Sequence, residues 1–205
     1  MNQKDNYNIA IIGMGYVGLP LAIEFGKFFN TIGFDIKEKR INQLNMEIDS
    51  NLEFTDKNIQ SAKYLSFTSN ERDIKKSNIY IITVPTPIHD DYTPNLDYIV
   101  AASKLVGSVL KKEDIVIYES TVYPGCTEDC CVPILEEQSK LKYNYDFFCG
   151  YSPERINPGD KEHSLKDIIK VTSGSNPEVA KWINLFYGSI IEAGTHLTQN
   201  IKTAE

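Results

Sequence analysis

The stretch NIAIIGMGYVGLPLAIEFG, residues 8–26, begins as an apolar run and becomes an amphipathic pattern after three glycines. The apolar run is typical of a strand that is covered on both faces of a sheet. The pattern after the glycines predicts a helix that packs one face back on that strand. Its inward positions, at near-helical spacing, are Val17, Leu21, Phe25 and Phe28.

The three glycines, Gly13, Gly15 and Gly18, have the spacing G-x-G-x-x-G. Alone this pattern is weak, but a strand before it and a helix after it give each glycine a physical role. The first permits a tight turn, the second lets the backbone approach a pyrophosphate, and the third lets the helix pack close to the strand. The helix N-terminus presents free N–H groups and a partial positive charge to the phosphates. The stretch therefore predicts a dinucleotide site.

An acidic residue at the end of the next strand is the second mark of such a site. Asp35 ends the strand-like TIGFD, residues 31–35. Its carboxylate can accept hydrogen bonds from the ribose diol of an adenosine and would repel a 2′-phosphate, which favours NAD over NADP. Lys37 and Arg40 lie nearby and argue in the other direction. The alternative is a tight turn in an α/β fold that binds no cofactor.

Strand and helix patterns alternate along the rest of the chain. Further strands are expected within residues 64–69, 79–84, 114–120, 145–154, 168–175 and 189–198. Helices are expected within 37–45, 55–62, 71–77, 96–110, 126–138 and 176–187, with an interruption near Pro133 and an N-cap at Asn176. This order is typical of one α/β domain, a Rossmann-like doubly wound and mostly parallel sheet with helices on both faces.

Composition narrows the classes of partner. The chain has 205 residues and a formal net charge of −7, which argues against a nucleic-acid partner because such surfaces are usually basic. No apolar run approaches the roughly 20 residues of a membrane span. The polar N-terminus carries no apolar signal-peptide core. We therefore expect a cytoplasmic protein without a membrane partner.

Three of the four cysteines cluster in CTEDCC, residues 126–131. A zinc site normally uses four nitrogen or sulfur ligands, and no histidine lies near this cluster. We expect small buried thiols in a reducing compartment, and no metal site.

Three polar loops follow predicted strands: TVPTP (83–87), ESTVYPG (119–125) and YSPERINPGD (151–160). A doubly wound sheet binds ligands at the carboxyl ends of its strands, so these loops are expected to meet beside the dinucleotide site and form a substrate wall. Glu154 and Arg155 are a charged pair at this place. The alternative for them is a solvated surface ion pair, which contributes little.

These segments, together with IIGMGYVGLPLA (11–22) and GFD (33–35), stand in the order found in the UDP-glucose/GDP-mannose dehydrogenase family. Over nearly its whole length the chain resembles the NAD-binding domain of that family. YESTVYPGCTE and GYSPERINPGD look most like the UDP-N-acetyl-D-glucosamine and UDP-N-acetyl-D-galactosamine 6-dehydrogenases of bacterial Vi-type capsule and O-antigen pathways, which belong to polysaccharide biosynthesis. Pro158 stands where UDP-glucose dehydrogenases commonly have a second glutamate, which argues against UDP-glucose as the substrate.

The resemblance implies an activity and a role for each site residue. The family oxidises C6 of a nucleotide sugar twice, from alcohol to acid, with two NAD⁺ and one water. Thr121 would help to position the catalytic water, and Glu154 would serve in acid/base work and, with Arg155 and Asn157, in substrate binding. The cofactor would be held at the pyrophosphate by Gly13, Gly15, Gly18 and the amides of Tyr16 and Val17, at the adenosine ribose by Asp35 and Arg40, and along its length by Val84, Pro85, Thr86, Ser120 and Thr121.

The resemblance also implies parts that these residues do not contain. The family's cysteine nucleophile stands in a G-G-H-C-type motif, and its catalytic lysine follows an A-E pair; the sequence has no such motif, and Lys202 precedes its A-E pair. We expect an NAD-binding domain at 1–200 and the start of a truncated central helix at 201–205. The full-length enzyme is expected to be a homodimer, and this chain a monomer or weak dimer with an exposed apolar patch. The alternatives are a stand-alone NAD-binding module without turnover and another Rossmann hydroxy-acid dehydrogenase.

Overall fold

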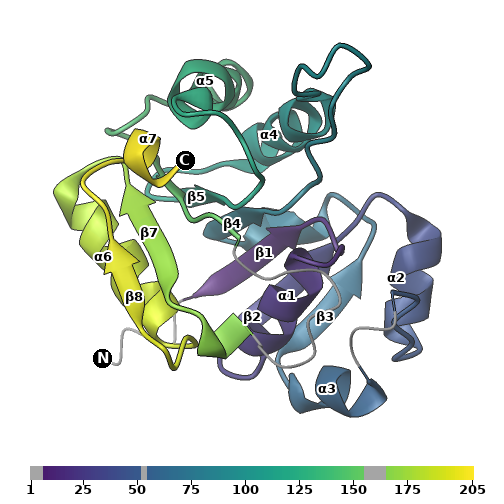
Figure 1. The fold of residues 1–205 in the computed structure, drawn as a ribbon. Helices are drawn as coiled ribbons and strands as arrows, with labels where there is room; N and C mark the ends of the chain where they lie inside the picture. The colour runs from purple at the N-terminus through teal and green to yellow at the C-terminus, as the bar shows by residue number, and fades with distance from the viewer. Residues whose placement is uncertain (1–6, 52–54, 155–164) are drawn as a thin grey trace.

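The computed structural model describes residues 7–51, 55–154 and 165–205, which form one eight-stranded sheet with helices on both faces (Figure 1). The strand order is β3-β2-β1-β4-β5-β6-β7-β8. All neighbouring strands are parallel except β6 and β7, which are antiparallel. The strands are β1 (Asn8–Ile12), β2 (Asn30–Phe34), β3 (Leu65–Thr68), β4 (Ile79–Ile82), β5 (Ile115–Tyr118), β6 (Phe148–Tyr151), β7 (Lys170–Gly174) and β8 (Thr195–Leu197).

Most helices fall at the places that the sequence patterns predict, but the segment 71–77 contains only a short 3-10 helix, Asp73–Lys76. The α-helices are α1 (Gly18–Gly26), α2 (Glu38–Asn45), α3 (Asp56–Ser61), α4 (Asp97–Val109), α5 (Val132–Ser139), α6 (Pro177–Gly188) and α7 (Ile201–Ala204). Asn176 caps α6, because its side chain accepts hydrogen bonds from the amides of Glu178 and Val179. None of the described helices is long and apolar enough to cross a membrane.

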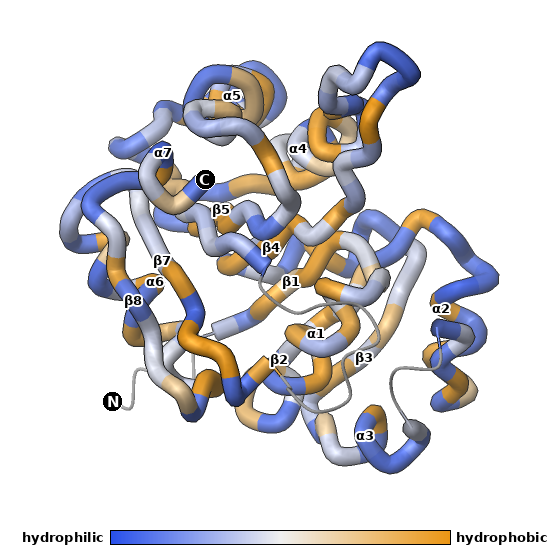
Figure 2. Tube along the Cα trace, in the orientation of Figure 1, coloured by the Kyte–Doolittle hydropathy of each residue, from blue (hydrophilic) through white to orange (hydrophobic). Residues whose placement is uncertain are grey.

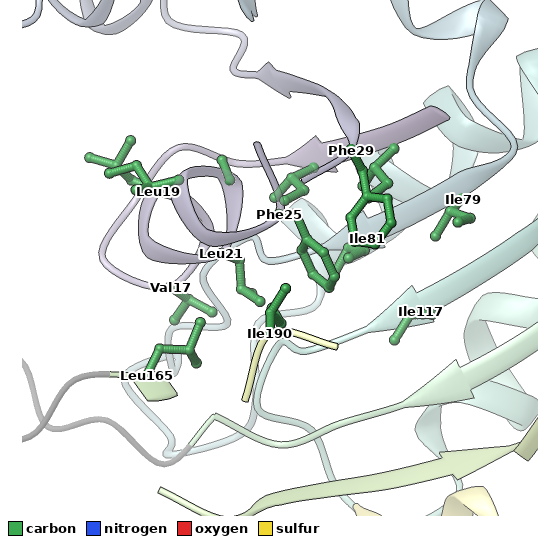
Figure 3. Packing of buried hydrophobic residues seen from close by; sticks show 14 of the residues in the cluster. Val17, Leu19, Leu21, Phe25, Phe29, Ile79, Ile81, Ile117, Leu165 and Ile190 are labelled. Atoms are coloured by element: carbon green, nitrogen blue, oxygen red, sulfur yellow. The ribbon is translucent and has the colours of Figure 1, made fainter. Parts of the chain in front are cut away.

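The core lies on both sides of the sheet because β1 is apolar and buried at every position from Ile9 to Ile12. Ile9 and Ile11 belong to the cluster that α1 and α6 cover, and Ala10 and Ile12 belong to the cluster under α4 and α5. Figure 3 shows the first cluster, in which side chains of α1 such as Phe25 point toward the central strands. Figure 2 shows the same arrangement as apolar colour on the central strands and hydrophilic colour on many outer loops. A strand buried on both faces is what a continuous apolar run predicts.

The end of α1 and the segment 189–198 differ from the sequence prediction. The helix α1 ends at Gly26, so the helical spacing no longer applies beyond it: Phe28 is 57% exposed, and Phe29 is buried in its place. Within 189–198 only Thr195–Leu197 form a strand.

The cysteine-rich segment bends as expected near Pro133. Residues Thr127–Cys131 form one wide helical turn, and α5 starts at Val132 with the proline in its first turn. The cysteines are free thiols. Cys126, Cys131 and Cys149 are buried, which confirms the prediction of small buried thiols for these three, whereas Cys130 is half-buried. Among the residues that the structure describes, no group of three or more His, Cys, Asp or Glu side chains is placed to hold a metal ion.

Candidate dinucleotide and substrate site

A cavity of about 510 Å³ opens at the carboxyl ends of the central strands. The strands β1 and β4 are neighbours there although they are not consecutive in the chain, which makes this the switch point where open α/β sheets bind ligands. The volume is in the range of small-molecule and cofactor sites. The lining residues are Gly13, Met14, Gly15, Tyr16, Val17, Asp35, Lys37, Lys39, Arg40, Gln43, Ser50, Asn51, Thr83, Val84, Pro85, Thr86, Glu119, Ser120, Thr121 and Glu154.

The glycine turn has the geometry that a bound pyrophosphate requires. Gly13 has φ +103°, a conformation that other residues rarely adopt. A Cβ added at Gly18 would lie 1.8 Å from the Gly13 carbonyl oxygen, so only glycine lets α1 start this close to the turn. A Cβ at Gly15 would meet nothing within 4 Å. Because Gly15 lines the cavity, that open space is available to a ligand that approaches the backbone.

The N-terminus of α1 faces this turn without a side-chain cap. Its N-cap residue is Val17, whose side chain makes no capping hydrogen bond. The hydroxyl of Thr83 donates to the carbonyl oxygens of Ile12 and Gly13, at 3.0 and 2.9 Å, and so fixes the turn to the end of β4. The Leu19 amide donates to the Gly15 carbonyl at 3.1 Å, whereas the amides of Tyr16 and Val17 have no partner among the described residues and remain available to a phosphate, a group that helix N-termini bind readily.

Asp35 is held rigidly beside the turn. One carboxylate oxygen accepts from the Met14 amide and the other from the Lys37 amide, both at 2.9 Å. Each carboxylate oxygen can accept more than one hydrogen bond, so Asp35 retains capacity for the two hydroxyls of a ribose. The backbone contacts orient this acceptor before a ligand arrives.

Arg40 is buried along the same wall and is shared between the turn and a loop. Its Nε donates to the Met14 carbonyl at 2.9 Å, and one terminal nitrogen contacts Asp49 at 2.7 Å and Ser50 at 3.1 Å. The other terminal nitrogen is buried and has no hydrogen-bond partner among the described residues. Arg40 lines the cavity, so its positive charge lies close to a nucleotide bound there.

Short hydrogen bonds join the loops after β4 and β5. The Ser120 hydroxyl donates to the Val84 carbonyl, and the Thr86 hydroxyl donates to the Thr121 carbonyl, both at 2.6 Å. The Tyr151 hydroxyl donates to the Ser120 carbonyl at 3.1 Å from the end of β6. The exposed Thr121 side chain therefore stands on a backbone that is fixed from both sides.

Glu154 borders the cavity at the end of β6 and faces a buried ammonium group. Its Oε2 lies 3.6 Å from the Nζ of Lys170, and Nζ also contacts Glu119 at 2.7 Å. The Tyr187 hydroxyl donates to the other oxygen of Glu119. Burial raises the pKa of the Glu119 carboxyl, while the Lys170 charge opposes this shift.

A second carboxylate holds the far end of the Thr121 loop. Glu205 accepts hydrogen bonds from the amides of Gly125 and Thr127, at 2.5 and 2.8 Å. Both amides lie at the start of the wide turn Thr127–Cys131, so the carboxylate satisfies donors that would otherwise lack partners. The residues just before α5 are thereby tied to the end of α7.

Most of the site residues predicted from sequence lie around the one cavity; Gly18 packs beneath the turn instead, and Arg155 and Asn157 lie outside the described residues. The sequence argument missed several lining residues: Lys39, Gln43, Ser50, Asn51 and Glu119. Ser50 and Asn51 come from an ordinary polar loop that carries no signal of its own. Glu119 belongs to the predicted loop 119–125, but the sequence of that loop does not indicate that Glu119 is buried.

The strand order β3-β2-β1-β4-β5-β6, with a glycine turn after β1 and an acidic residue after β2, defines the NAD-binding domain of a Rossmann-fold dehydrogenase. The chain belongs to the UDP-glucose/GDP-mannose dehydrogenase family: residues 7–191 match the NAD binding domain of that family. The fold class, the family and NAD as the cofactor are therefore confirmed.

Known proteins resemble the chain in sequence and in structure. It is 57% identical over 197 residues to UDP-N-acetyl-D-glucosamine 6-dehydrogenase of Pseudomonas aeruginosa, covering 96% of this chain and 47% of the relative. It is 55% identical over 201 residues to the enzyme of the same name from Salmonella typhi, covering 98% and 47%. The solved structure of UDP-D-ManNAc dehydrogenase from Pyrococcus horikoshii superposes with a TM-score of 0.90 at 32% identity, over 97% of this chain and 48% of that one. The chain thus spans about half the length of these relatives.

Proposed function

We propose that this chain is the NAD-binding part of an enzyme that oxidises a UDP-N-acetylhexosamine at C6 to the uronic acid. One observation carries the proposal: a single cavity joins the glycine turn and Asp35 to Thr121 and Glu154. A cofactor held at the glycine turn would therefore share this cavity with the candidate catalytic groups Thr121 and Glu154. The names of the 55–57% identical relatives support this substrate class.

Different residues at the turn suit the pyrophosphate and the adenosine ribose of the cofactor. The open space at Gly15 and the amides of Tyr16 and Val17 just before α1 suit a pyrophosphate. Asp35, with the positive charge of Arg40 beside it, suits an adenosine ribose. Val84, Pro85 and Thr86 line the cavity between this end and Thr121.

The bound cofactor supplies a hydride acceptor. Ser120 and Thr121 are proposed to border the nicotinamide ribose and the reacting C6, with Thr121 positioning water. Glu154 is proposed to move the proton, because a carboxylate within reach of the reacting group is a suitable general base. Arg155 and Asn157 are proposed to bind the sugar nucleotide.

The organisation of the whole protein is part of the proposal. Residues 1–200 are assigned to NAD binding and 201–205 to the start of a central helix that leads into UDP-sugar domains. The enzyme is proposed to act in the cytoplasm as a homodimer. The helix α7, Ile201–Ala204, supports the assignment of helical structure at this boundary.

Calorimetry and absorbance on one sample test the proposal. We expect NAD⁺ to bind more tightly than NADP⁺, and addition of UDP-N-acetylhexosamines to produce no NADH from the 205-residue chain alone. UDP-glucose serves as the control sugar nucleotide. If neither nucleotide binds, the assignment of the cavity is wrong; if NADH accumulates, the chain contains its own nucleophile and the division of labour proposed above is wrong.

A further inference from the structure

The reversed strand β7 brings a lysine to the ligand-binding edge of the sheet. Lys170 is the first residue of β7, and in a parallel strand the first residue would lie at the opposite edge. Because β7 runs antiparallel to β6, Lys170 instead lies beyond the pair Tyr151–Ser173, next to the loop that carries Glu154. The antiparallel direction of β7 thus places the Lys170 ammonium group behind the loop that carries Glu154.

The ammonium group of Lys170 is buried and has defined neighbours on three elements. It contacts Glu119 Oε2 at 2.7 Å, the Pro153 carbonyl at 3.3 Å and Glu154 Oε2 at 3.6 Å. It also lies 5.8 Å from the centre of the Tyr187 ring. The Lys170 side chain is 3% exposed, that of Glu119 0% and that of Glu154 10%.

Such a group is difficult to explain as a device for stability. A buried ion pair contributes little net stabilisation because the cost of removing both charges from water offsets their attraction. Here one ammonium also faces two carboxylates, so the charges do not cancel. Perturbed buried charges of this kind are concentrated at functional sites.

The two carboxylates that contact Lys170 differ: one holds the lysine in place, and we call it the anchor; the other is the group that the lysine acts on, and we call it the target. Glu119 is the anchor, because it makes the short contact to Lys170 and is itself held by the Tyr187 hydroxyl. Glu154 is the target, because its contact is longer and its carboxylate borders the cavity. Lys170 does not line the cavity, so its effect on a ligand would pass through Glu154.

We propose that Lys170, anchored by Glu119 and Tyr187, is a positioning residue that sets the orientation of the Glu154 carboxylate. The role of Glu154 rests on the function proposed above, but the cluster can be tested without it. The pKa of Glu119 supports the coupling: burial raises it, the Lys170 charge lowers it and the Glu154 charge raises it.

The test is a carbon-13 NMR titration of the Glu119 carboxyl in the full 205-residue chain. We expect E154Q to lower the pKa of Glu119, because the like charge is removed, and K170M to raise it. K170R should restore a value near that of the wild type. E192Q is the matched control: Glu192 is 74% exposed and contacts Lys166 instead, so its loss should leave Glu119 unchanged.

Two outcomes would overturn the inference. If E154Q, which changes a residue at the cavity and not the anchor, leaves the Glu119 titration where it was, Lys170 and Glu119 form only a structural pair. If a crystal structure of K170M shows Glu154 in its original position, Lys170 does not position it. NAD⁺ calorimetry on the same samples separates this from the proposed function, because K170M should bind NAD⁺ as the wild type does, whereas failure of the wild type to bind would refute only the function.

Discussion

Replacement of Gly15 and of Gly18 by alanine should affect different properties: the first should weaken ligand binding, and the second should destabilise the fold. At Gly18 the new Cβ would lie 1.8 Å from the Gly13 carbonyl oxygen and 2.5 Å from the Thr83 hydroxyl, both far inside van der Waals contact. At Gly15 the new Cβ would meet no atom within 4 Å. The substitution at Gly18 therefore damages the fold, and the one at Gly15 occupies only the space left for a ligand.

The magnitudes follow from these distances. Overpacking of a close contact costs about 1–3 kcal/mol, so G18A should lower the free energy of unfolding by at least about 1 kcal/mol. G15A should leave it unchanged or raise it by up to about 1 kcal/mol, because alanine restricts the unfolded chain. For NAD⁺ the methyl group would separate a phosphate from backbone amides. Loss of one charge-assisted hydrogen bond costs about 1.5–3 kcal/mol, which raises Kd roughly 10- to 150-fold.

Urea unfolding and NAD⁺ calorimetry on the wild type, G15A and G18A check both numbers. The two variants differ only in which glycine receives the methyl group, so each is the control for the other. The reasoning is refuted if G15A binds NAD⁺ as tightly as the wild type, or if G18A unfolds at the same urea concentration as the wild type.

Four further changes test other parts of the structure. D35N should weaken NAD⁺ roughly tenfold and narrow the preference over NADP⁺, because an amide accepts fewer ribose hydrogen bonds and does not repel a 2′-phosphate; calorimetry showing an unchanged preference contradicts this. N176A removes the cap of α6 and should lower the free energy of unfolding by about 1 kcal/mol in urea, with NAD⁺ affinity unaltered as the control. E205Q should speed hydrogen exchange at the two amides that Glu205 holds, while amides in β1 keep their rates; equal rates would show that the carboxylate charge is unimportant. The pKa of Glu119 is raised in the folded state, so this group contributes stability that is fully present below its ordinary pKa of 4.5 and is lost as pH rises through the folded-state pKa. E119Q should therefore make the free energy of unfolding, measured in urea, fall less steeply with pH than in the wild type. Wild-type and E119Q curves that run parallel over this pH range would contradict the reasoning.

The sequence predicted where the glycine turn and Asp35 lie because these parts of the fold are local in the chain. The strand β1, the glycine turn, α1 and β2 with Asp35 follow one another without interruption, and each has its own pattern. An apolar run, a glycine at φ +103° and an acidic residue after a strand are readable one by one. The prediction failed at Phe28 because periodicity does not say where α1 ends.

The sequence by itself determined the fold class, the dinucleotide turn and the acceptor beside it, since hydrophobic periodicity and glycine spacing report directly on short-range geometry. Only the tertiary structure decided the partners of the charged groups. Lys170 meets Glu119 across 51 positions of sequence, and Glu205 meets Gly125 across 80. The local sequence pattern does not indicate such pairs, because a lysine or glutamate is the same letter in the sequence whether its side chain is solvated or buried. The pairing follows from the strand order and from the reversed direction of β7, which bring distant strand ends together at one edge.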